Sequence, residues 1–452
     1  MREAKTRAEI EGLARLIAAH TYGTWRPQRG WQRPLFIARA EGVRFYDEQG
    51  KAYLDFSSQL MCSNLGHGNQ ALIRAICEQA ERLPYVFPGF GCEAQARAVE
   101  SLLGVMPPGL DQFFFSTSGT EANEAALKII RQYLAPKYKI ISRYRSYHGS
   151  TSGSIALTGD FRRWFAEPAN KIPGVAFAPD PYCYRCPFGL EHPGCGLQCA
   201  EYIDYMIQEE GNVAAVFIEP VVGTNGVIVP PRGYLPRLRE ICDRNGVLLV
   251  VDEVMSGWLR TGEWFAINHW GVKPDILTTA KGCTGAYTPV GITATTKEIR
   301  AHFEERFFPH GHTYTMHPLA VAAIPAAIAE YKRLLASGLP QRVSKHLERG
   351  LRELMGRHKS VGDVRGLGHF WAVELVRNRE TKEPFNTQAD KAALRPLMTS
   401  RLAEEMLKRG VYVASWSNHF IVAPPLIITE EEVDEGLEAF DAVLEIADKE
   451  VR

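Results

Sequence analysis

Short apolar runs alternate with helix-like segments through the middle of the chain. The runs are DQFFF (111–115), YKIIS (138–142), VAAVFIE (213–219), VLLVVDE (247–253), DILTTA (275–280) and VGITATT (290–296). Each has the length of a buried strand, and the segments between them, such as EANEAALKIIRQYL and YLPRLREICDRNG, place apolar residues at helical spacing. This alternation predicts an α/β fold in which helices cover a mostly parallel sheet.

The pattern changes towards both ends of the chain. After about residue 330, a long helix is followed by VGDVRGLGHFWAVELV, a helix near 396–409 and the strands GVYVAS and HFIVAPPLIIT, an order that indicates a smaller α+β unit. Near the N-terminus, FIARAEGVRFYDEQGKAYLDF is typical of a hairpin that turns around Glu48–Gly50. We therefore expect residues 1–60 to join a small domain of residues 331–452, with a large domain at 61–330.

Length and charge narrow the class of protein. A chain of 452 residues is expected to form two domains. Lys+Arg and Asp+Glu are equal at 52 each, which gives no broad electrostatic footprint for nucleic acid or an anionic membrane and favours small-molecule ligands. The N-terminal MREAKTRAEIEGLARLIAAH carries charges in every turn and predicts a surface helix rather than a signal peptide. No uncharged apolar run reaches the roughly 18–20 residues needed to cross a bilayer, so a soluble, cytoplasmic protein is expected.

Four of the nine cysteines are clustered in PYCYRCPFGLEHPGCGLQC. Cys183, Cys186, Cys195 and Cys199 form C-x2-C and C-x3-C pairs, a spacing that can bind zinc. The eight residues between the pairs are fewer than in common zinc ribbons. A structural metal and buried free thiols both remain open, and reduced thiols are expected elsewhere in a chain of this length.

A turn after the first predicted strand has the features of a phosphate site. In FFFSTSGTEANEAALKII a strand ends, a small polar turn follows and a helix begins. Ser118 and Glu121 fit a capping box, and the free N–H groups and dipole of a helix start stabilise a phosphate. The alternative is an ordinary strand–loop–helix cap that binds no ligand.

Two charged residues end neighbouring strands. Asp252 ends VLLVVD and Lys281 follows DILTTA, 29 residues later. Since a helical segment intervenes, both are expected at the same edge of the sheet, where open α/β sheets bind ligands. Asp252 and Glu253 would suit Mg²⁺ beside a nucleotide, but the chain lacks G-x-x-x-x-G-K-[ST]. The other possible role of Asp252 is to pair with a cationic ring nitrogen of a bound ligand.

Lys281 stands between an apolar run and a glycine-rich loop, TTAKGCTGAYTP. A partly desolvated lysine has a lowered pKa and becomes a nucleophile for aldehydes. Most lysines lie at the surface, so the interpretation of Lys281 as a nucleophile depends on the residues around it.

An aromatic residue in RSYHGSTSG completes the set. Tyr147 is expected to end a strand beside His148 and Gly149 and to lie flat on a planar ring, because glycine permits a close backbone approach. The alternative is a core tyrosine. The segment GSTSG does not match the G-x-S-x-G nucleophile pattern, since Thr151 holds its middle position.

Pyridoxal 5′-phosphate needs four kinds of protein contact, for all of which this sequence has candidates: N–H donors for its phosphate, an aromatic ring to stack on its own ring, a carboxylate for its ring nitrogen and an amine for its aldehyde. That cofactor supplies an electron sink, while the protein orients it and tunes its electronics. Asp252 is expected to keep the ring nitrogen protonated by charge pairing. Lys281 is expected to bond to the aldehyde, to be displaced by the incoming amine and then to carry the proton. No metal ligand is expected among these residues.

The sequence resembles the class III (omega) aminotransferases, which have the fold type I of pyridoxal-phosphate enzymes. The resemblance covers nearly the whole chain and rests on STSGTEANEAALK, YHG, FIEPVVGTNGVIVPP, LLVVDEVMSG, RTGEWFA, PDILTTAKG, HTYTMHP and APPLIIT. It implies a large domain with a mostly parallel seven-stranded sheet and a smaller α+β domain. It also implies a homodimer, which can pair into a tetramer, with active sites at the subunit interface.

The resemblance further implies a role for each matching residue. Ser118, Gly119 and Thr120 bind the phosphate, Tyr147 stacks on the ring, Val254 packs on its other face, Asp252 pairs with the ring nitrogen and Lys281 binds the aldehyde. His148 supports Asp252, Glu219 lies near the ring hydroxyl or the substrate, and Thr313 reaches the phosphate of the partner subunit.

Departures from the family pattern concern the substrate. Many relatives carry an arginine shortly before APP that binds a substrate carboxylate, but residues 414–422 read ASWSNHFIV. Arg162 and Arg163 in GDFRRWF are the candidates to replace it, and the alternative is a solvated surface pair. Leu259 and Met316 stand where relatives have glycine, which suggests an altered pocket wall.

Apolar residues are expected to line the pocket. Met61 falls where several amine-accepting relatives have a tryptophan. The other candidates are Tyr22, Trp25, Phe87 and Phe90. The PYCYRC insert and HTYGTW are most similar to the branch that uses taurine and omega-amino acids.

We therefore expect a ping-pong aminotransferase that moves an amino group from an omega-amino acid, taurine or an (S)-amine to pyruvate or 2-oxoglutarate. A decarboxylase or an aminomutase uses the same cofactor residues and remains an alternative. A nicotinamide oxidoreductase would need G-x-G-x-x-G, whereas GLGHFW at 366–371 ends in Trp371. A non-catalytic binding module would not need both the lysine and the aspartate. The sequence leaves the amino donor and the acceptor open.

Overall fold

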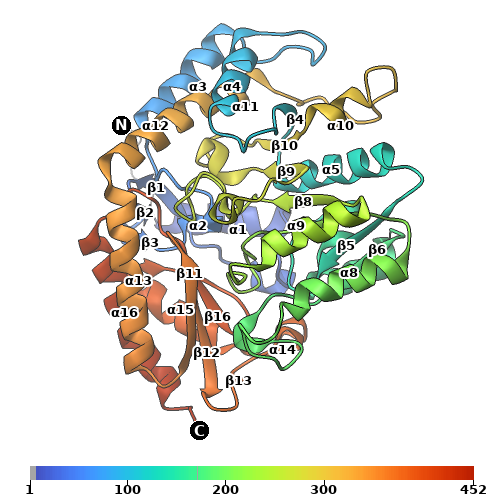
Figure 1. Cartoon of the computed structure of the whole chain (residues 1–452). Helices are drawn as coiled ribbons and strands as arrows, with labels where there is room; N and C mark the ends of the chain where they lie inside the picture. The colour runs from blue at the N-terminus through green and yellow to red at the C-terminus, as the bar shows by residue number, and fades with distance from the viewer. Residues whose placement is uncertain (1–6, 171) are drawn as a thin grey trace.

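A computed structural model describes residues 7–170 and 172–452 (Figure 1). The predicted N-terminal surface helix is α1 from Arg7 to His20, while the first six positions of that prediction lie outside the described residues. Within the described ranges, no helix combines the length and the apolar character that a membrane span requires.

The centre of the molecule is a seven-stranded sheet in the order β4-β10-β9-β8-β7-β5-β6. Only β10 runs antiparallel to its neighbours, so the predicted mostly parallel sheet is confirmed. Its strands are β4 (Gln112–Ser116), β5 (Lys139–Arg143), β6 (Val175–Ala178), β7 (Val213–Ile218), β8 (Leu248–Asp252), β9 (Ile276–Thr279) and β10 (Gly291–Thr295). The six apolar runs of the sequence all form strands because they are buried on both faces of the sheet. The unpredicted strand, β6, is a short, partly exposed edge strand.

Helices cover this sheet and form the outer layers. α5 packs on β9 and β10, and α8 lies beside α9 over the part of the sheet that contains β6 (Figure 1). The helices are α1 (Arg7–His20), α2 (Ser58–Met61), α3 (Gln70–Arg82), α4 (Glu93–Leu103), α5 (Gly119–Tyr133), α6 (Ser152–Leu157), α7 (Arg162–Asn170), α8 (Gln198–Glu210), α9 (Tyr234–Asn245), α10 (Lys297–Ala301), α11 (Pro318–Val321), α12 (Ala323–Ser337), α13 (Leu339–Arg357), α14 (Gln388–Ala392), α15 (Met398–Lys408) and α16 (Glu430–Asp448). Short 3-10 helices are η1 (Gln28–Gly30), η2 (Cys183–Arg185), η3 (Ala266–Trp270) and η4 (Lys281–Thr284).

The C-terminal part forms a separate sheet with its own apolar core. Its strands are β11 (Val361–Leu367), β12 (Phe370–Asn378), β13 (Glu383–Pro384), β15 (Ala414–Ser415) and β16 (His419–Val422), paired in the order β11-β12-β16-β15 with β13 on β12. α13 and α16 lie side by side against it (Figure 1). Leu347, Leu351, Phe420 and Phe440 are among the buried residues of this core.

The N-terminal strands pair with a strand from the far end of the chain. β1 (Ile37–Glu41), β2 (Arg44–Asp47) and β3 (Ala52–Asp55) are antiparallel, and β14 (Val411–Tyr412) adds to β3 in parallel. The hairpin predicted from the sequence is therefore present, and its sheet includes C-terminal chain. The boundaries at residues 60 and 330 stay a prediction.

A buried arginine connects three distant segments. The Arg260 guanidinium donates to the carbonyl oxygens of His369 and Pro424 at 3.2 and 2.6 Å. It also donates to Ser58 Oγ at 2.9 Å and Asn64 Oδ1 at 2.6 Å. Because these groups are buried, the hydrogen bonds fix the N-terminal and C-terminal parts against the large sheet.

His369, at the turn between β11 and β12, makes stability depend on pH. Its Nε2 lies 3.0 Å from the carbonyl oxygen of Pro340, while Nδ1 is buried without a partner near Arg260. Burial lowers the pKa of His369 to about 4. The unfolded chain binds this proton near pH 6.5, so the folded state loses stability as the pH falls from 6.5 towards 4.

We expect His369→Gln to remove that pH dependence. Between pH 7 and pH 4 the wild type should lose about 3 kcal/mol more of its free energy of unfolding than the variant does, as the pKa difference requires. Urea unfolding at several pH values measures this. His20→Gln, at the exposed end of α1, is the control and should behave like the wild type. Equal losses in wild type and His369→Gln would contradict the assignment.

Candidate active site

A cavity of about 880 Å³ opens at the carboxyl edge of the large sheet. It lies where the ends of β8 and β9, the start of α5, the loop after β5 and the segment around β15 meet. This is the edge at which open α/β sheets bind ligands. Most of the predicted site residues line it: Trp25, Met61, Ser118, Gly119, Thr120, Tyr147, His148, Arg162, Glu219, Asp252, Val254 and Lys281.

Other predicted residues lie outside this cavity. Tyr22 is exposed, and Phe87 and Phe90 pack edge to face at 5.4 Å on another part of the surface. Thr313 is also exposed, and its carbonyl oxygen accepts a hydrogen bond from Tyr85. The cavity of a single chain is therefore built without them.

The two residues that replace family glycines do not form the cavity wall in this chain. Leu259 is buried in the core of the large domain, and Met316 packs against the same core. Both have a positive φ, of 62° and 52°, a region of backbone conformation that glycine adopts more easily.

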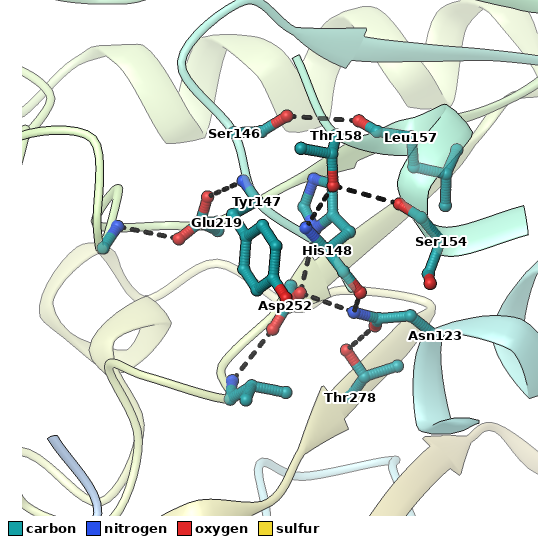
Figure 2. Close-up of polar contacts among 12 residues, drawn as sticks. Asn123, Ser146, Tyr147, His148, Ser154, Leu157, Thr158, Glu219, Asp252 and Thr278 are labelled. Atoms are coloured by element: carbon teal, nitrogen blue, oxygen red, sulfur yellow. Dashed lines mark hydrogen bonds and ion pairs between the residues drawn. The ribbon is translucent and has the colours of Figure 1, made fainter. Parts of the chain in front are cut away.

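Asp252 is almost fully buried at the end of β8 and accepts three hydrogen bonds (Figure 2). His148 Nδ1 and Asn123 Nδ2 lie 2.8 and 2.7 Å from Oδ2, and the Val254 N–H donates to Oδ1 at 2.9 Å. Thr278 Oγ1 donates to Asn123 Oδ1 at 2.6 Å and orients that amide. A buried carboxylate held in this way keeps one position and presents its negative charge to the cavity.

Sequence reasoning missed Asn123. It lies on α5 and is buried among alanine and isoleucine residues of that helix. The signal was present, because an amide within the apolar face of EANEAALKII needs a buried partner. Glu253, next to Asp252, turns away from the cavity and accepts from the N–H groups of Ala266 and Ile267.

Glu219 and Tyr147 are connected through the backbone. The Glu219 carboxylate accepts from the Tyr147 N–H at 3.0 Å and from the Gly223 N–H at 2.7 Å (Figure 2). Burial raises the pKa of Glu219 to about 7. Tyr147 lies four residues beyond the end of β5 rather than at a strand end, and its hydroxyl is 2.8 Å from Ser150 Oγ. Both the backbone N–H and the hydroxyl of Tyr147 are therefore held by hydrogen bonds.

Lys281 follows β9 and begins the 3-10 helix η4. Its φ is +44°, an uncommon value for a lysine, which the surrounding structure imposes. Burial lowers the pKa of Lys281, while the charges of Cys62, Asp252 and Glu219 partly oppose this shift. The amine therefore loses its proton more easily than a surface lysine and is available as a nucleophile.

The start of α5 faces the same cavity. Ser118 Oγ accepts from the Glu121 N–H at 3.2 Å and caps the helix. The predicted capping box is only half present, because the Glu121 carboxylate accepts from Thr117, from its N–H at 2.7 Å and its hydroxyl at 2.6 Å. A Cβ built on Gly119 would lie 2.7 Å from Val254 Cγ1, so glycine lets the helix start and Val254 pack closely. Such a helix start stabilises an anion.

Arg162 and Arg163 separate at the start of α7. Arg162 lines the cavity, with its Cζ 3.7 Å from the centre of the Tyr147 ring and 4.6 Å from that of Trp416. Arg163 points elsewhere, pairs with Glu167 and lies over Phe177. Only the first of the two candidate arginines is part of the site.

The four clustered cysteines surround a separate void of about 20 Å³. Cys195 Sγ lies 4.0 Å from His192 Nδ1, and the cysteines are free thiols. Across residues 7–170 and 172–452, no three His, Cys, Asp or Glu side chains are grouped closely enough to hold a metal ion.

Known proteins are similar to this chain over almost its whole length. Residues 27–444 match the family model "Aminotransferase class-III". A leucine/methionine racemase from Thermococcus litoralis is 36% identical, over 91% of this chain and 90% of its own. A taurine–pyruvate aminotransferase from Bilophila wadsworthia is 34% identical, over 90% and 91% of the two chains. The solved taurine:2-oxoglutarate aminotransferase from Bifidobacterium kashiwanohense, in complex with PLP and glutamate, superposes with a TM-score of 0.91 at 34% identity and covers 98% of this chain and 99% of its own.

Proposed function

Since the chain belongs to the class III aminotransferases, which depend on pyridoxal 5′-phosphate, we propose that its amino donor carries an anionic group at the end remote from the amine. Taurine and omega-amino acids are donors of this kind, and pyruvate or 2-oxoglutarate is the proposed acceptor. The observation that carries the proposal is the fixed guanidinium of Arg162 in the same cavity as Lys281.

The residues of the cavity fit the cofactor. The start of α5, with Ser118, Gly119 and Thr120, offers N–H donors to its phosphate, and a Cβ at Gly119 would collide with Val254. The buried Asp252 carboxylate suits a cationic ring nitrogen, and Lys281 is an amine with a lowered pKa for the aldehyde.

Each of these residues has a proposed part in the reaction. The bound cofactor withdraws electrons from the carbon next to the amine, which weakens the C–H bond there. Asp252 holds positive charge on the ring nitrogen, with His148 and Asn123 keeping the carboxylate in place. Lys281 would hold the cofactor's aldehyde and would move the proton at the substrate carbon, because its amine has a lowered pKa. Tyr147 and Val254 would pack on the cofactor ring, and Glu219 would lie near the substrate.

Arg162 is held in one orientation by its neighbours. Its Nε donates to the Asp160 carboxylate oxygens at 3.1 and 2.9 Å, and Nη2 also contacts Asp160. Asp160 is itself buried and accepts from Asn225 Nδ2 at 3.0 Å. Asp160 therefore fixes the guanidinium, and Nη1 has no hydrogen-bond partner within residues 7–170 and 172–452, so we propose it as the donor to the substrate anion.

A second cation lies near the Arg162–Asp160 pair, outside the lining of the cavity. Lys391, on α14, lies with its Nζ 4.4 Å from the centre of the Trp416 ring. Burial lowers the pKa of Lys391 to about 8, and the nearby charge of Arg162 contributes to this shift. Arg162 and Lys391 are therefore two basic side chains beside one carboxylate, Asp160, which favours a substrate that brings a negative charge to Arg162.

Trp416 lies in the segment where many relatives have their carboxylate-binding arginine. Its indole N–H donates to Asn225 Oδ1 at 3.1 Å and its ring contacts Arg162. We propose that the anion-binding group has moved in this chain from residues 414–422 to Arg162, with Trp416 as its support.

We expect Arg162→Gln to lower kcat/KM for taurine and β-alanine by about 10- to 100-fold, the effect of losing a charge-assisted hydrogen bond. Turnover of the uncharged donor 1-phenylethylamine should stay within about threefold of the wild type, since it makes no such bond. Initial rates with pyruvate and with 2-oxoglutarate measure both. Arg74→Gln is the control, because it removes an exposed charge on α3 away from the cavity, and it should resemble the wild type. An equal loss for charged and uncharged donors, or turnover of the uncharged donor only, would contradict the proposed donor class.

Racemisation is the second function to test, because a relative of similar identity is named a leucine/methionine racemase. Decarboxylation and amino-group migration use the same kind of site. A transaminase forms the new amino acid and the oxo product in equal amounts. Release of carbon dioxide, or formation of the donor's enantiomer without an acceptor, would identify one of the other reactions.

We further propose a cytoplasmic homodimer that completes the site. Several large aromatic side chains are exposed on the chain: Phe87, Phe90, Phe307 and Tyr314. A second copy of the chain would cover such side chains and would bring Thr313 towards the phosphate of the partner subunit. Tyr22 and Phe87 would then approach the substrate from the partner.

A further inference from the structure

A second pocket, of about 480 Å³, lies behind the active-site cavity and shares no lining residue with it. We call it the arginine pocket. Its walls come from the loop after β5, the start of α7, the loop after β6 and η2, with Gln388 of α14 at its edge. The residues that matter for its chemistry are Tyr144, Arg145, Arg163, Trp164, Asp180 and Arg185.

Three arginine side chains in this pocket have unused hydrogen-bond donors. Among the described residues, the guanidinium of Arg145 makes neither an ion pair nor a hydrogen bond, and its nearest aromatic contact is the Tyr182 ring at 5.0 Å. Arg163 Nε and Arg185 Nη2 are buried and have no partner, although other nitrogens of both groups bind glutamates. Buried N–H groups without partners are costly, so they indicate a ligand or ordered solvent in this pocket.

The charges around the pocket do not balance. Asp180 is the only carboxylate that lines it, and it accepts from the Arg145 N–H at 3.1 and 3.3 Å. Burial raises the pKa of Asp180 to about 6, against the opposing charges of Arg143 and Arg145. Arg143 is itself buried behind Asp180, with Nε and Nη1 unpartnered. Glu374, the partner of Arg185, is shared with Arg365, which also pairs with Asp363. The excess of positive charge therefore comes from Arg143 and Arg145, which lie together near the single carboxylate of Asp180.

We propose that the arginine pocket binds a small oxyanion with at least two negative charges, either a phosphate or a polycarboxylate. Arg145, Arg163 and Arg185 would each donate to it, in the fork geometry that guanidinium groups offer to such anions. Tyr144 and Trp164 are partly exposed at the pocket, which gives an organic anion flat surfaces to pack against.

The pocket is connected to the active site by two short paths. Arg163 follows Arg162 directly at the start of α7. The second path is α14, on which Gln388 lines the arginine pocket. Lys391 lies about one helical turn further along α14 and contacts Trp416. An anion held between α7 and α14 would steady Arg162 through its neighbour Arg163 and Trp416 through Lys391, so it should tighten binding of the anionic donor.

Titration of the holoenzyme with inorganic phosphate and, separately, with citrate tests the site by calorimetry. We expect Arg145→Gln to weaken binding of the preferred anion about tenfold or more, the effect of one charge-assisted hydrogen bond. The variant should fold normally and keep its rate at saturating donor, because the Arg145 guanidinium holds no other group. Arg74→Gln, which removes an exposed charge on α3 away from both pockets, is the matched control. Binding of phosphate alone or of citrate alone tells which source the pocket accepts.

A second variant makes the test independent of Arg145. Gln388→Glu places a carboxylate at the pocket edge, where it would pair with the free arginine donors. It should weaken anion binding to a similar extent and raise the temperature of thermal unfolding. If neither anion binds the wild type, or if both variants bind as the wild type does, the proposal is wrong.

Discussion

Replacement of Lys281 by alanine will abolish transamination, with a loss of about 10,000-fold or more in kcat, if this one side chain has the role we propose and supplies both the covalent bond to the cofactor and the proton transfer. The amine stands at the end of β9 in the same cavity as Asp252, and burial lowers its pKa. No other lysine lines this cavity among the described residues, so none replaces it. Rates with saturating donor measure the loss of turnover, and the visible absorption of the lysine-bound cofactor measures the loss of the covalent bond.

Two further observations separate chemistry from folding in that experiment. A buried lysine amine destabilises a folded protein, so Lys281→Ala without cofactor should unfold at the same temperature as the cofactor-free wild type or higher. Lys281→Arg keeps the positive charge but gives up no proton near neutral pH, and it should be as inactive as the alanine variant. Activity of Lys281→Ala near the wild-type rate would exclude this lysine as the reacting group.

The sequence contained the sheet and the centre of the site because both follow from local rules. Runs such as VLLVV are apolar throughout, which is the pattern of strands buried on two faces. A charged residue at the end of such a run must lie at the carboxyl edge of the sheet, which brought Asp252 and Lys281 into one cavity. The short edge strand β6 was not predicted, because partial exposure weakens its apolar pattern.

The sequence alone could not predict the direction in which each side chain points. Arg162 and Arg163 are adjacent, and successive helical residues point about 100° apart, so one enters the cavity and the other does not. Sequence spacing cannot tell which of the two it is without the packing of Asp160 and Trp416. Asn123 was missed for a related reason, because its role depends on Asp252, which lies 129 positions away. Thr313, Tyr22 and Phe87 do not face the cavity of their own chain, so their roles depend on a second copy.

The second large effect is expected at Asp252. The carboxylate accepts from His148, Asn123 and the Val254 N–H, so each oxygen already has a donor and the whole group is fixed. Asparagine has nearly the same shape but no charge, and its amide N–H would oppose one of these donors. The ring nitrogen would then lose the negative charge that keeps it protonated, and the electron demand on the substrate carbon would fall.

We expect Asp252→Asn to lower kcat by about 100- to 1,000-fold, the scale of removing one preorganised electrostatic contact. Asn123→Ala removes a hydrogen bond to the carboxylate but leaves its charge, so it should reduce kcat by about tenfold, the lower end of the value of one hydrogen bond to a charged group. Single-turnover rates with saturating donor, together with the absorption spectrum of the bound cofactor over a range of pH, distinguish lost charge from lost position. Only the loss of charge should move the pH at which that spectrum changes, so Asp252→Asn should shift it and Asn123→Ala should not. If Asp252→Asn binds the cofactor with an unchanged spectrum and turns over within threefold of the wild type, the carboxylate does not act on the ring nitrogen.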